Sequence, residues 1–396
     1  MRRPVAPIVK IVSHGEEIVI ENARHLFDIP ADVAYLNLAY MSPLPRASVA
    51  AGVAALEGKA HPWNTAPRDF FAPLERARTL FANLIGADAD GIAVVPSAGY
   101  GISIAARNLK LQRGQTILTL AEEFPANVYP WRRLAQTCGA RMVTVTRNQG
   151  EDWTSALLAA IDGNTGLVAV PNCHWTDGAR VDLERVSRAA KANGAALVLD
   201  LTQSAGAMPV DVKALGADFA VAATYKWLLG PYALGFLYVA PQWRNGEPLE
   251  ESWSNRKDAE NFARLVDYDD AYMPGARRFD MGEKAQHQLM PVALASLEQL
   301  TAWGVASVAE TLAAKTAAIA ARAAEELGCR SEPAASRARH YLGLRRDGLP
   351  ADLVARLAAE KVYVSVRGDA IRVTPHVYTT DGDIDRFIAA LKKALA

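Results

Sequence analysis

The chain has 396 residues, of which 51% are hydrophobic, and its 43 Lys and Arg residues balance its 43 Asp and Glu residues. This length predicts two domains, and the balanced charge, with no basic run among aromatic residues, argues against nucleic acid or a membrane surface as a partner and favours a small molecule. Three scattered cysteines, Cys138, Cys173 and Cys329, argue against a disulfide framework or a zinc cluster and fit a reducing cytoplasm.

Residues 1–40 are predicted to form an N-terminal segment. It begins with two arginines but contains no sustained apolar run of the signal-peptide type, and no later stretch is long enough to cross a bilayer. The sequence therefore predicts a soluble, cytoplasmic protein without a targeting segment.

Strand-like and helix-like segments alternate from about residue 90 to 240, within a large domain predicted over residues 41–270. This rhythm is typical of a mostly parallel sheet covered by helices on both faces. The predicted strands are 92–95, 116–120, 141–146, 167–170, 196–199, 219–222 and 234–239. The predicted helices are 99–109, 129–138, 153–161 and 183–192.

The pattern changes after Pro241, where a polar stretch with aromatic residues begins. An Ala-rich amphipathic helical region follows over residues 291–327, with Gly304 as an interruption. Short apolar runs and a last helix from Asp383 then indicate a small α+β layer. Residues 271–396 are predicted to form this smaller C-terminal domain.

Asp200 and Lys226 are the residues with the most informative chemistry. Asp200 follows a predicted strand, at the carboxyl end where ligands bind in open α/β sheets, and a carboxylate there can keep a pyridine nitrogen protonated. Lys226 lies on a loop between two apolar runs and can form an imine with an aldehyde. Each residue alone is more often a turn former or a solvated surface charge. Together they have the two roles that a protein supplies to pyridoxal 5′-phosphate (PLP).

A second strand end, in the segment VVPSAGYG, leads into a helical pattern. Free amides of Ser97, Ala98 and Gly99 at the start of that helix, with the Ser97 hydroxyl, suit a phosphate group. The alternative is an ordinary turn with serine as the helix cap. The segment lacks the Gly-Lys-Ser ending of a Walker loop and is not a dinucleotide fingerprint.

Polar and aromatic residues follow two further strands. Phe124 can lie against a pyridine ring, although core packing is the commoner fate of a lone phenylalanine. Asn172 and Gln203 can donate to the phenolate oxygen of the cofactor and so tune its proton affinity. His174 can act as a base, or can be a capping and packing residue.

Six segments together resemble the class V aminotransferase family of PLP enzymes, which includes cysteine desulfurases, selenocysteine lyases, kynureninases and isopenicillin N epimerase-like proteins. They are YLNLAYMSPLP, SAGYG, EEFPANVYPW, LDLTQSAG, TYKWLLGP and IRVTPHVYTT. The resemblance implies the aspartate aminotransferase-like fold, also called fold type I, with a mostly parallel seven-stranded sheet in the large domain and a smaller C-terminal α+β domain. It also implies covalently bound PLP and a homodimer with active sites at the subunit interface.

The resemblance assigns further roles by position. Lys226 becomes the Schiff-base lysine, Asp200 the partner of the ring nitrogen, and Thr224 or Tyr225 a contact of the phosphate. Arg372 is expected to clamp the substrate carboxylate, as its fork of donors suits a planar carboxylate. The other expected substrate-binding residues are Asn37 and Tyr40.

Departures from the family pattern reduce the number of candidate activities. Desulfurases need a nucleophilic cysteine ahead of the carboxylate-binding arginine, whereas this chain has Arg367, Gly368 and Asp369 there. Desulfurases also usually stack a histidine on the ring, where this chain has Phe124. A persulfide-forming desulfurase is therefore disfavoured.

Many relatives have a Gly-Thr pair whose hydroxyl reaches the phosphate across the dimer, but this chain has Gly282 and Glu283. A carboxylate would repel a phosphate. We expect either that Glu283 points away or that Arg277 and Arg278 take over this contact.

The expected reaction begins when an amino acid or amine displaces Lys226 from the cofactor. An aminotransferase is the first prediction, because no dedicated acid for a leaving group is evident. The alternatives are a lyase that cleaves a C–S or C–C bond, with Tyr129, His174 or Tyr232 as proton donor, and an epimerase. A non-catalytic PLP-fold protein is the least expected, because the lysine, the aspartate and the arginine are all present.

Overall fold

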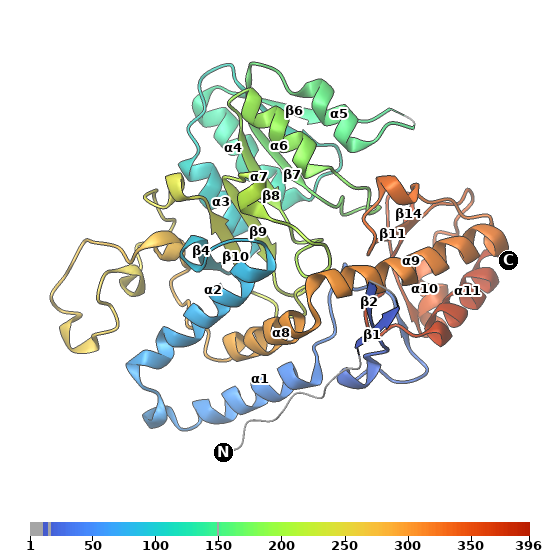
Figure 1. Ribbon diagram of the computed structural model, residues 1–396, viewed down its shortest axis with the longest axis horizontal. Coiled ribbons are helices and arrows are strands. Elements are labelled where there is room, and N and C mark those ends of the chain that lie inside the picture. The colour runs from blue at the N-terminus through green and yellow to red at the C-terminus, as the bar shows by residue number, and fades with distance from the viewer. Residues whose placement is uncertain (1–10, 15–16, 149) are drawn as a thin grey trace.

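The computed structural model describes residues 11–14, 17–148 and 150–396 (Figure 1). Its centre is a seven-stranded sheet in the order β4-β10-β9-β8-β7-β5-β6. β10 is antiparallel to both of its neighbours, and the other pairs are parallel, which confirms the predicted sheet. In chain order the strands are β4 (Ile92–Val95), β5 (Thr116–Leu120), β6 (Arg141–Val145), β7 (Thr165–Pro171), β8 (Ala196–Asp200), β9 (Phe219–Ala223) and β10 (Gly235–Val239).

Both faces of this sheet are buried, which explains why its strands read as continuous apolar runs. Successive residues of one strand enter different cores: Ile117 lies in the core under α3 and α4, and Leu118 lies in the core that contains residues of α5 and α6. The four helices are α3 (Ala98–Asn108), α4 (Tyr129–Cys138), α5 (Trp153–Ala160) and α6 (Leu183–Ala192). Their bounds lie within one residue of those predicted.

Polar caps start three of these helices. The side chains of Ser97, Asp152 and Asp182 accept hydrogen bonds from backbone amides in the first turns of α3, α5 and α6. Such caps satisfy amides that have no partner within the helix. The cap at Ser97 places the first turn of α3 directly after β4, at the edge of the sheet.

A second group of helices packs beside the sheet. α8 (Leu289–Trp303) packs against α1 (Arg46–Lys59) and α2 (Ala72–Leu84). α9 (Val305–Leu327) follows after Gly304, whose φ of +77° breaks the helical path where the sequence predicts an interruption. Within the described ranges no single helix is long and apolar enough to cross a membrane; α8 and α9 pass that test only as a pair, bent by 79°.

The C-terminal elements surround a separate core at one end of the molecule (Figure 1). An antiparallel sheet in the order β11-β14-β13 lies there, and a two-residue pairing joins β12 to β3 in parallel. This is the predicted small α+β layer, although β3 comes from the N-terminal segment. The elements are β3 (Ala34–Tyr35), β11 (Leu342–Leu344), α10 (Leu353–Ala359), β12 (Val362–Tyr363), β13 (Ser365–Arg367), β14 (Ala370–Val373) and α11 (Asp381–Leu395).

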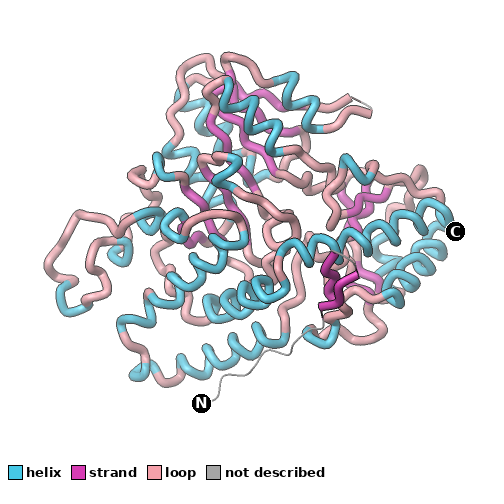
Figure 2. Tube along the Cα trace, viewed as in Figure 1, coloured by secondary structure: helices cyan, strands magenta, loops and turns pink. Residues whose placement is uncertain are grey.

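The remaining elements are short. β1 (Ile11–His14) and β2 (Glu17–Ile20) pair with each other, and α7 (Val212–Leu215) precedes β9. Between β10 and α8 the chain forms a long segment with short 3₁₀ turns (Figure 2). Part of the predicted N-terminal segment, residues 1–10, 15 and 16, lies outside the described residues. The domain boundaries at residues 41 and 271 stay predictions.

Candidate active site

A cavity of about 300 Å³ opens at the carboxyl ends of the parallel strands. This volume is at the lower end of the range for small-molecule sites, roughly 300 to 1,000 Å³. The segments that follow β4, β5, β7, β8 and β9 each contribute to its wall. The predicted site residues that line it are Ser97, Ala98, Gly99, Phe124, Asp200, Gln203, Tyr225 and Lys226.

Lys226 is buried in this wall, with its Nζ 5.4 Å from the centroid of the Phe124 ring. Burial, helped by the charges of Arg372 and Arg367 and opposed by that of Asp200, lowers its pKa to about 8. About a tenth of the amine is therefore uncharged at pH 7, far more than for an ordinary lysine. Only the uncharged amine attacks an aldehyde, so this lysine is prepared for imine formation.

Asp200 is the last residue of β8, and its side chain is buried in the same cavity. Its Oδ1 accepts a hydrogen bond from the amide of Thr202 at 3.0 Å. Burial raises the pKa of Asp200, an effect that the hydrogen bonds from Thr202 and the charge of Lys226 partly offset. A protonated ring nitrogen at this point would compensate the buried carboxylate, so the residue fits the pyridine of PLP.

The first turn of α3 forms another part of the wall. Ser97 Oγ accepts a hydrogen bond from the Tyr100 amide at 3.1 Å and retains its own proton to donate. The amides of Ala98 and Gly99 have no acceptor within the helix, because they lie in its first turn. These groups fit the phosphate of the cofactor.

The two predicted phosphate contacts on the lysine loop differ in position. Thr224 Oγ1 lies 2.5 Å from the carbonyl oxygen of Pro231 and 2.9 Å from that of Leu234, so this hydroxyl closes the loop on itself. Tyr225 lines the cavity. The geometry therefore favours Tyr225 of the two alternatives.

Gln203 and Phe124 are held in place by neighbouring groups. Gln203 Oε1 accepts a hydrogen bond from Trp227 Nε1 at 3.0 Å, and its Nε2 donates to the carbonyl of Ala39 at 3.2 Å. One N–H of this amide is left for a ligand. The Phe124 and Trp175 rings pack edge to face, with their centroids 5.3 Å apart.

Asn172 and His174 do not line this cavity. Asn172 lies in the wall of a different cavity, and its Nδ2 contacts the sulfur of Met208 at 3.6 Å. The His174 ring is buried, with Nδ1 2.8 Å from Thr176 Oγ1 and Nε2 3.1 Å from the carbonyl oxygen of Ala121. Both ring nitrogens of His174 are engaged, so this geometry supports packing rather than catalysis for the histidine.

Arg372 belongs to β14 and is fully buried. Its Nε donates to Ser365 Oγ at 2.8 Å, and Ser365 Oγ in turn donates to Asn37 Oδ1 at 2.9 Å. Its Nη1 donates to the carbonyl of Trp175 at 3.1 Å. Asn37 thus orients the arginine indirectly, whereas the Tyr40 side chain is 55% exposed.

Glu123 and Trp175 also line the cavity and were not among the predicted site residues. Burial raises the pKa of Glu123 to about 7, and one of its oxygens has no hydrogen-bond partner within the described part of the chain. Trp175 Nε1 donates to the carbonyl of Glu122 at 2.6 Å. Both residues lie directly beside predicted site residues, and that adjacency was the signal available for them.

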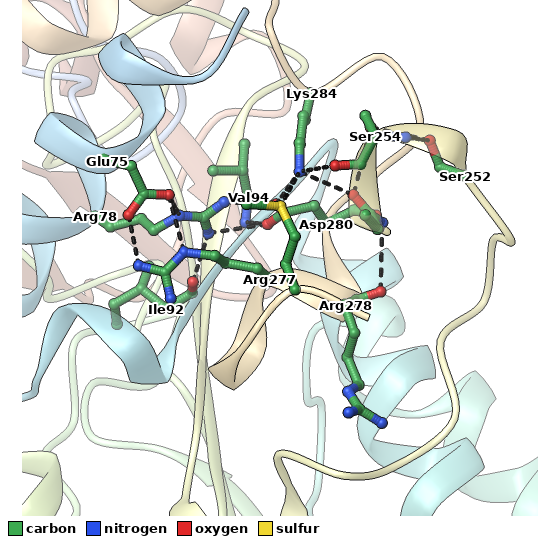
Figure 3. A network of polar contacts seen from close by, with 12 residues as sticks. Glu75, Arg78, Ile92, Val94, Ser252, Ser254, Arg277, Arg278, Asp280 and Lys284 are labelled. Atoms are coloured by element: carbon green, nitrogen blue, oxygen red, sulfur yellow. Dashed lines mark hydrogen bonds and ion pairs between the residues drawn. The ribbon is translucent and has the colours of Figure 1, made fainter. Parts of the chain in front are cut away.

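A buried polar network supports the β4 side of the site (Figure 3). Asp280 accepts hydrogen bonds from Arg78 Nη2 at 2.5 Å, from Lys284 Nζ at 3.1 Å and from the Val94 amide at 2.8 Å. The carboxylate therefore joins α2 and the segment after residue 279 to the strand that precedes Ser97. Opposite charges in this network compensate one another away from water.

The two arginines expected to take over a phosphate contact differ in how strongly they are engaged elsewhere. Arg277 forms ion pairs with Glu75 at 2.5 Å and Asp90 at 2.7 Å. Arg278 donates to the carbonyl of Gly246 at 3.3 Å. Figure 3 shows the Arg277 side chain directed toward Glu75. Of the two expectations for Glu283, the one in which Arg277 and Arg278 take over the contact is thus disfavoured for Arg277 and stays a prediction for Arg278.

Solved structures share this fold. A cysteine desulfurase from Thermococcus onnurineus NA1 superposes with a TM-score of 0.81 at 22% sequence identity, and covers 94% of this chain and 97% of its own. A mutant of C-DES with glycine covalently linked to its PLP cofactor gives a TM-score of 0.83 at 20% identity over 93% and 98% of the two chains. The fold is that of PLP-dependent enzymes, which confirms the predicted fold class.

Sequence relatives define the family. A model of class V aminotransferases matches residues 57–373. The uncharacterized aminotransferase YcbU of Bacillus subtilis is 29% identical over 77% of this chain and 80% of its own. The kynureninase of Deinococcus radiodurans is 34% identical over 66% of this chain, and the match spans 64% of the kynureninase, less than two thirds of its length. The protein belongs to the class V aminotransferase family, whose members are PLP-dependent enzymes, so the predicted family and cofactor are confirmed.

Proposed function

We propose that the protein is an aminotransferase that acts on an amino acid or amine, with Lys226 as the residue that attaches the cofactor. The observation that carries this proposal is the presence of a buried lysine, with a pKa of about 8, in the same cavity as buried Asp200. A lysine and an aspartate in these positions supply the two functions that PLP requires.

The residues around the cavity fit the parts of the cofactor. Asp200 would meet the ring nitrogen, Phe124 would lie against the ring, and Gln203 would donate to the phenolate. The start of α3 and Tyr225 would hold the phosphate. When bound, PLP withdraws electrons from the carbon that carries the substrate amine. His174, buried outside the cavity, would hold the segment after β5 in place through its contact with the carbonyl oxygen of Ala121.

The chain's own groups then position the substrate and move its proton. Arg372 is fixed by Ser365 and Trp175, and its remaining donors can bind a carboxylate. Lys226, released from the cofactor, is the base that can take a proton from the substrate carbon, because its pKa lies near neutral pH. In transamination Lys226 would hold that proton and deliver it to the cofactor instead of returning it to the substrate carbon.

A lyase is the second candidate, favoured by two observations. Tyr232 lines the cavity, and Glu123 lines it with a pKa raised by burial to about 7, so either can carry a proton for a leaving group. A persulfide-forming desulfurase remains disfavoured. Cys173, the cysteine in the wall, is buried, and burial raises the pKa of its thiol, which suppresses the nucleophilic thiolate.

Product analysis tests the reaction type. The PLP-loaded protein is incubated with single amino acids, with and without a 2-oxo acid acceptor. The proposal expects release of the substrate's 2-oxo acid in proportion to amination of the acceptor. Ammonia or a cleaved side chain, formed without an acceptor, would instead establish a lyase, and inversion at the substrate carbon alone would establish an epimerase.

We also propose a homodimer that works in the cytoplasm. Helix α1 exposes a row of apolar side chains, Val49, Val53 and Leu56, which a second subunit would cover. The three cysteines are unpaired within the described structure, which fits a reducing compartment.

A further inference from the structure

Two arginine side chains lie against one aromatic ring beside the cavity. The guanidinium carbons of Arg372 and Arg367 lie 5.8 Å and 5.9 Å from the centroid of the Trp175 ring. Trp175 lines the cavity together with Lys226. The positive charges of both arginines lower the pKa of Lys226, so they lie close enough to act on the amine that would attach the cofactor.

Neither guanidinium has a carboxylate partner within the described ranges. Arg372 donates to Ser365 and Trp175, and Arg367 Nη1 donates to the carbonyl of Val366 at 2.7 Å. Nearby Arg345 differs, because it forms ion pairs with Asp177 at 2.8 Å and with Asp369 at 2.9 Å. The segment thus has acidic residues, but they pair with Arg345 and leave Arg367 and Arg372 for other anions.

Two unpaired cations close together carry an electrostatic cost. Partial burial lowers the pKa of Arg367, and the charge of Arg372 lowers it further. Anions that reach both side chains would offset this repulsion. One carboxylate satisfies one guanidinium in the two-point geometry that makes such pairs strong, so two guanidinium groups suit two acidic groups.

We infer that the substrate is an amino acid with a second acidic group, and that Arg372 binds its α-carboxylate while Arg367 binds the acid of its side chain. This inference rests on the proposed function and specifies its substrate class. The Trp175 ring provides a flat apolar wall beside both guanidinium groups. A monocarboxylic substrate leaves Arg367 unpaired, and sites that leave a partly buried polar group without its partner discriminate strongly.

Binding of unreactive acids tests the inference without turnover. Glutarate and succinate serve as dicarboxylic probes and butyrate as the monocarboxylic probe, in calorimetric titrations of the PLP-loaded protein. We expect the better dicarboxylate to bind at least tenfold more tightly than butyrate. Arg367→Gln should abolish this preference and leave butyrate binding unchanged, and Arg367→Lys, which keeps the charge but not the fork of donors, should retain part of it.

Arg330→Gln is the matched control, because Arg330 is exposed and forms an ion pair with Asp347. It should leave all three affinities unchanged. Equal binding of mono- and dicarboxylates by the wild type, or an unchanged preference in Arg367→Gln, would overturn the inference. The absorption spectrum of the same samples reports cofactor binding separately: a protein that binds PLP without preferring dicarboxylates refutes the substrate class alone, whereas a protein that takes up no PLP refutes the proposed function.

Discussion

Lys226 differs from an ordinary lysine because its amine is buried, which lowers its pKa from 10.5 to about 8. We predict that the rate of PLP uptake by the cofactor-free protein rises with pH, with a midpoint near 8, because only the neutral amine reacts. Stopped-flow absorbance over pH 6 to about 11 measures this rate, with Nα-acetyllysine as the solvent-exposed reference. A midpoint near 10.5 would show that Lys226 is not buried in solution.

Glu123 makes stability depend on pH in the opposite direction to a salt-bridged carboxylate. Burial raises its pKa from 4.5 to about 7, so between these values the folded state binds more protons than the unfolded state. Its contribution to stability is therefore present below pH 4.5 and is lost as pH rises through 7. At about 1.4 kcal/mol per pKa unit, this loss is on the order of 3 kcal/mol.

Replacement of the carboxyl group tests this dependence. In Glu123→Gln, the free energy of unfolding of the cofactor-free protein should fall less between pH 5 and about 7.5 than in the wild type. The difference should be on the order of 3 kcal/mol. Urea unfolding at the two pH values measures the difference. Parallel pH profiles for the variant and the wild type would contradict a raised pKa at Glu123.

Strand ends in the sequence indicated which segments form the site, but not always which residues. Alternate residues of extended chain point to opposite sides. After β7, Cys173 and Trp175 line the cavity, whereas Asn172 and His174 do not. After β9 the chain turns, and there Tyr225 lines the cavity whereas the Thr224 hydroxyl donates within the loop. The sequence shows that residues alternate, but it does not show which of the two sets faces the cavity, because packing against distant segments decides that.

At the scale of elements, the turn after β8 and the lysine loop approach each other at Gly206. Its φ is +95°, and a Cβ there would lie 2.5 Å from the carbonyl oxygen of Trp227. We predict that Gly206→Ala displaces the lysine loop relative to Asp200, lowers the melting temperature and weakens PLP binding. Thermal unfolding and PLP titration measure the two effects.

Gly194→Ala is the matched control for this substitution. Gly194 also has a positive φ, +69°, but no atom lies within 4 Å of the position of its added Cβ. Gly194→Ala should lower the free energy of unfolding only by the backbone strain, about 1 to 2 kcal/mol, and leave the affinity for PLP unchanged. If Gly206→Ala were no more harmful than Gly194→Ala, the close approach would not matter to the site.

Asp280 joins α2, β4 and the segment before α8 through buried ion pairs. Asp280→Ala leaves Arg78 and Lys284 buried without their shared anion, and we predict a loss of about 3 to 5 kcal/mol in the free energy of unfolding. Asp385→Ala removes the exposed partner of Arg322 and should change the free energy of unfolding by at most about 1 kcal/mol. Chemical denaturation distinguishes the two, and equal small losses would contradict a structural role for the network.

The long elements were predictable because burial on both faces leaves an unmistakable apolar run, as in β5 and β7, and because Gly304 breaks a helical pattern. β3 and β12 were not predictable. Each has two residues, and each is a strand only because the other lies beside it. A pairing between segments more than 300 residues apart leaves no local signal in either.

At the scale of the whole molecule, the candidate site joins the large sheet to the C-terminal sheet. Lys226 and Asp200 come from the large sheet, whereas Arg372 comes from the C-terminal sheet. The segment around Trp175 connects them, because its carbonyl accepts hydrogen bonds from Arg372 and from Tyr341. Substrate recognition therefore depends on how the C-terminal layer is held against the large sheet, which the sequence alone could not specify.

Reduction of the PLP-loaded protein with borohydride, followed by peptide mass analysis, tests the central claim most directly, because it fixes the cofactor to the lysine that holds it. The structure predicts that the pyridoxyl group is on Lys226, and that Lys226→Ala loses both the label and the visible band of the bound cofactor. The exposed Lys213, replaced by Ala, is the control and should change neither. A label on another lysine, or no stable label, would contradict the assignment of this cavity as the PLP site.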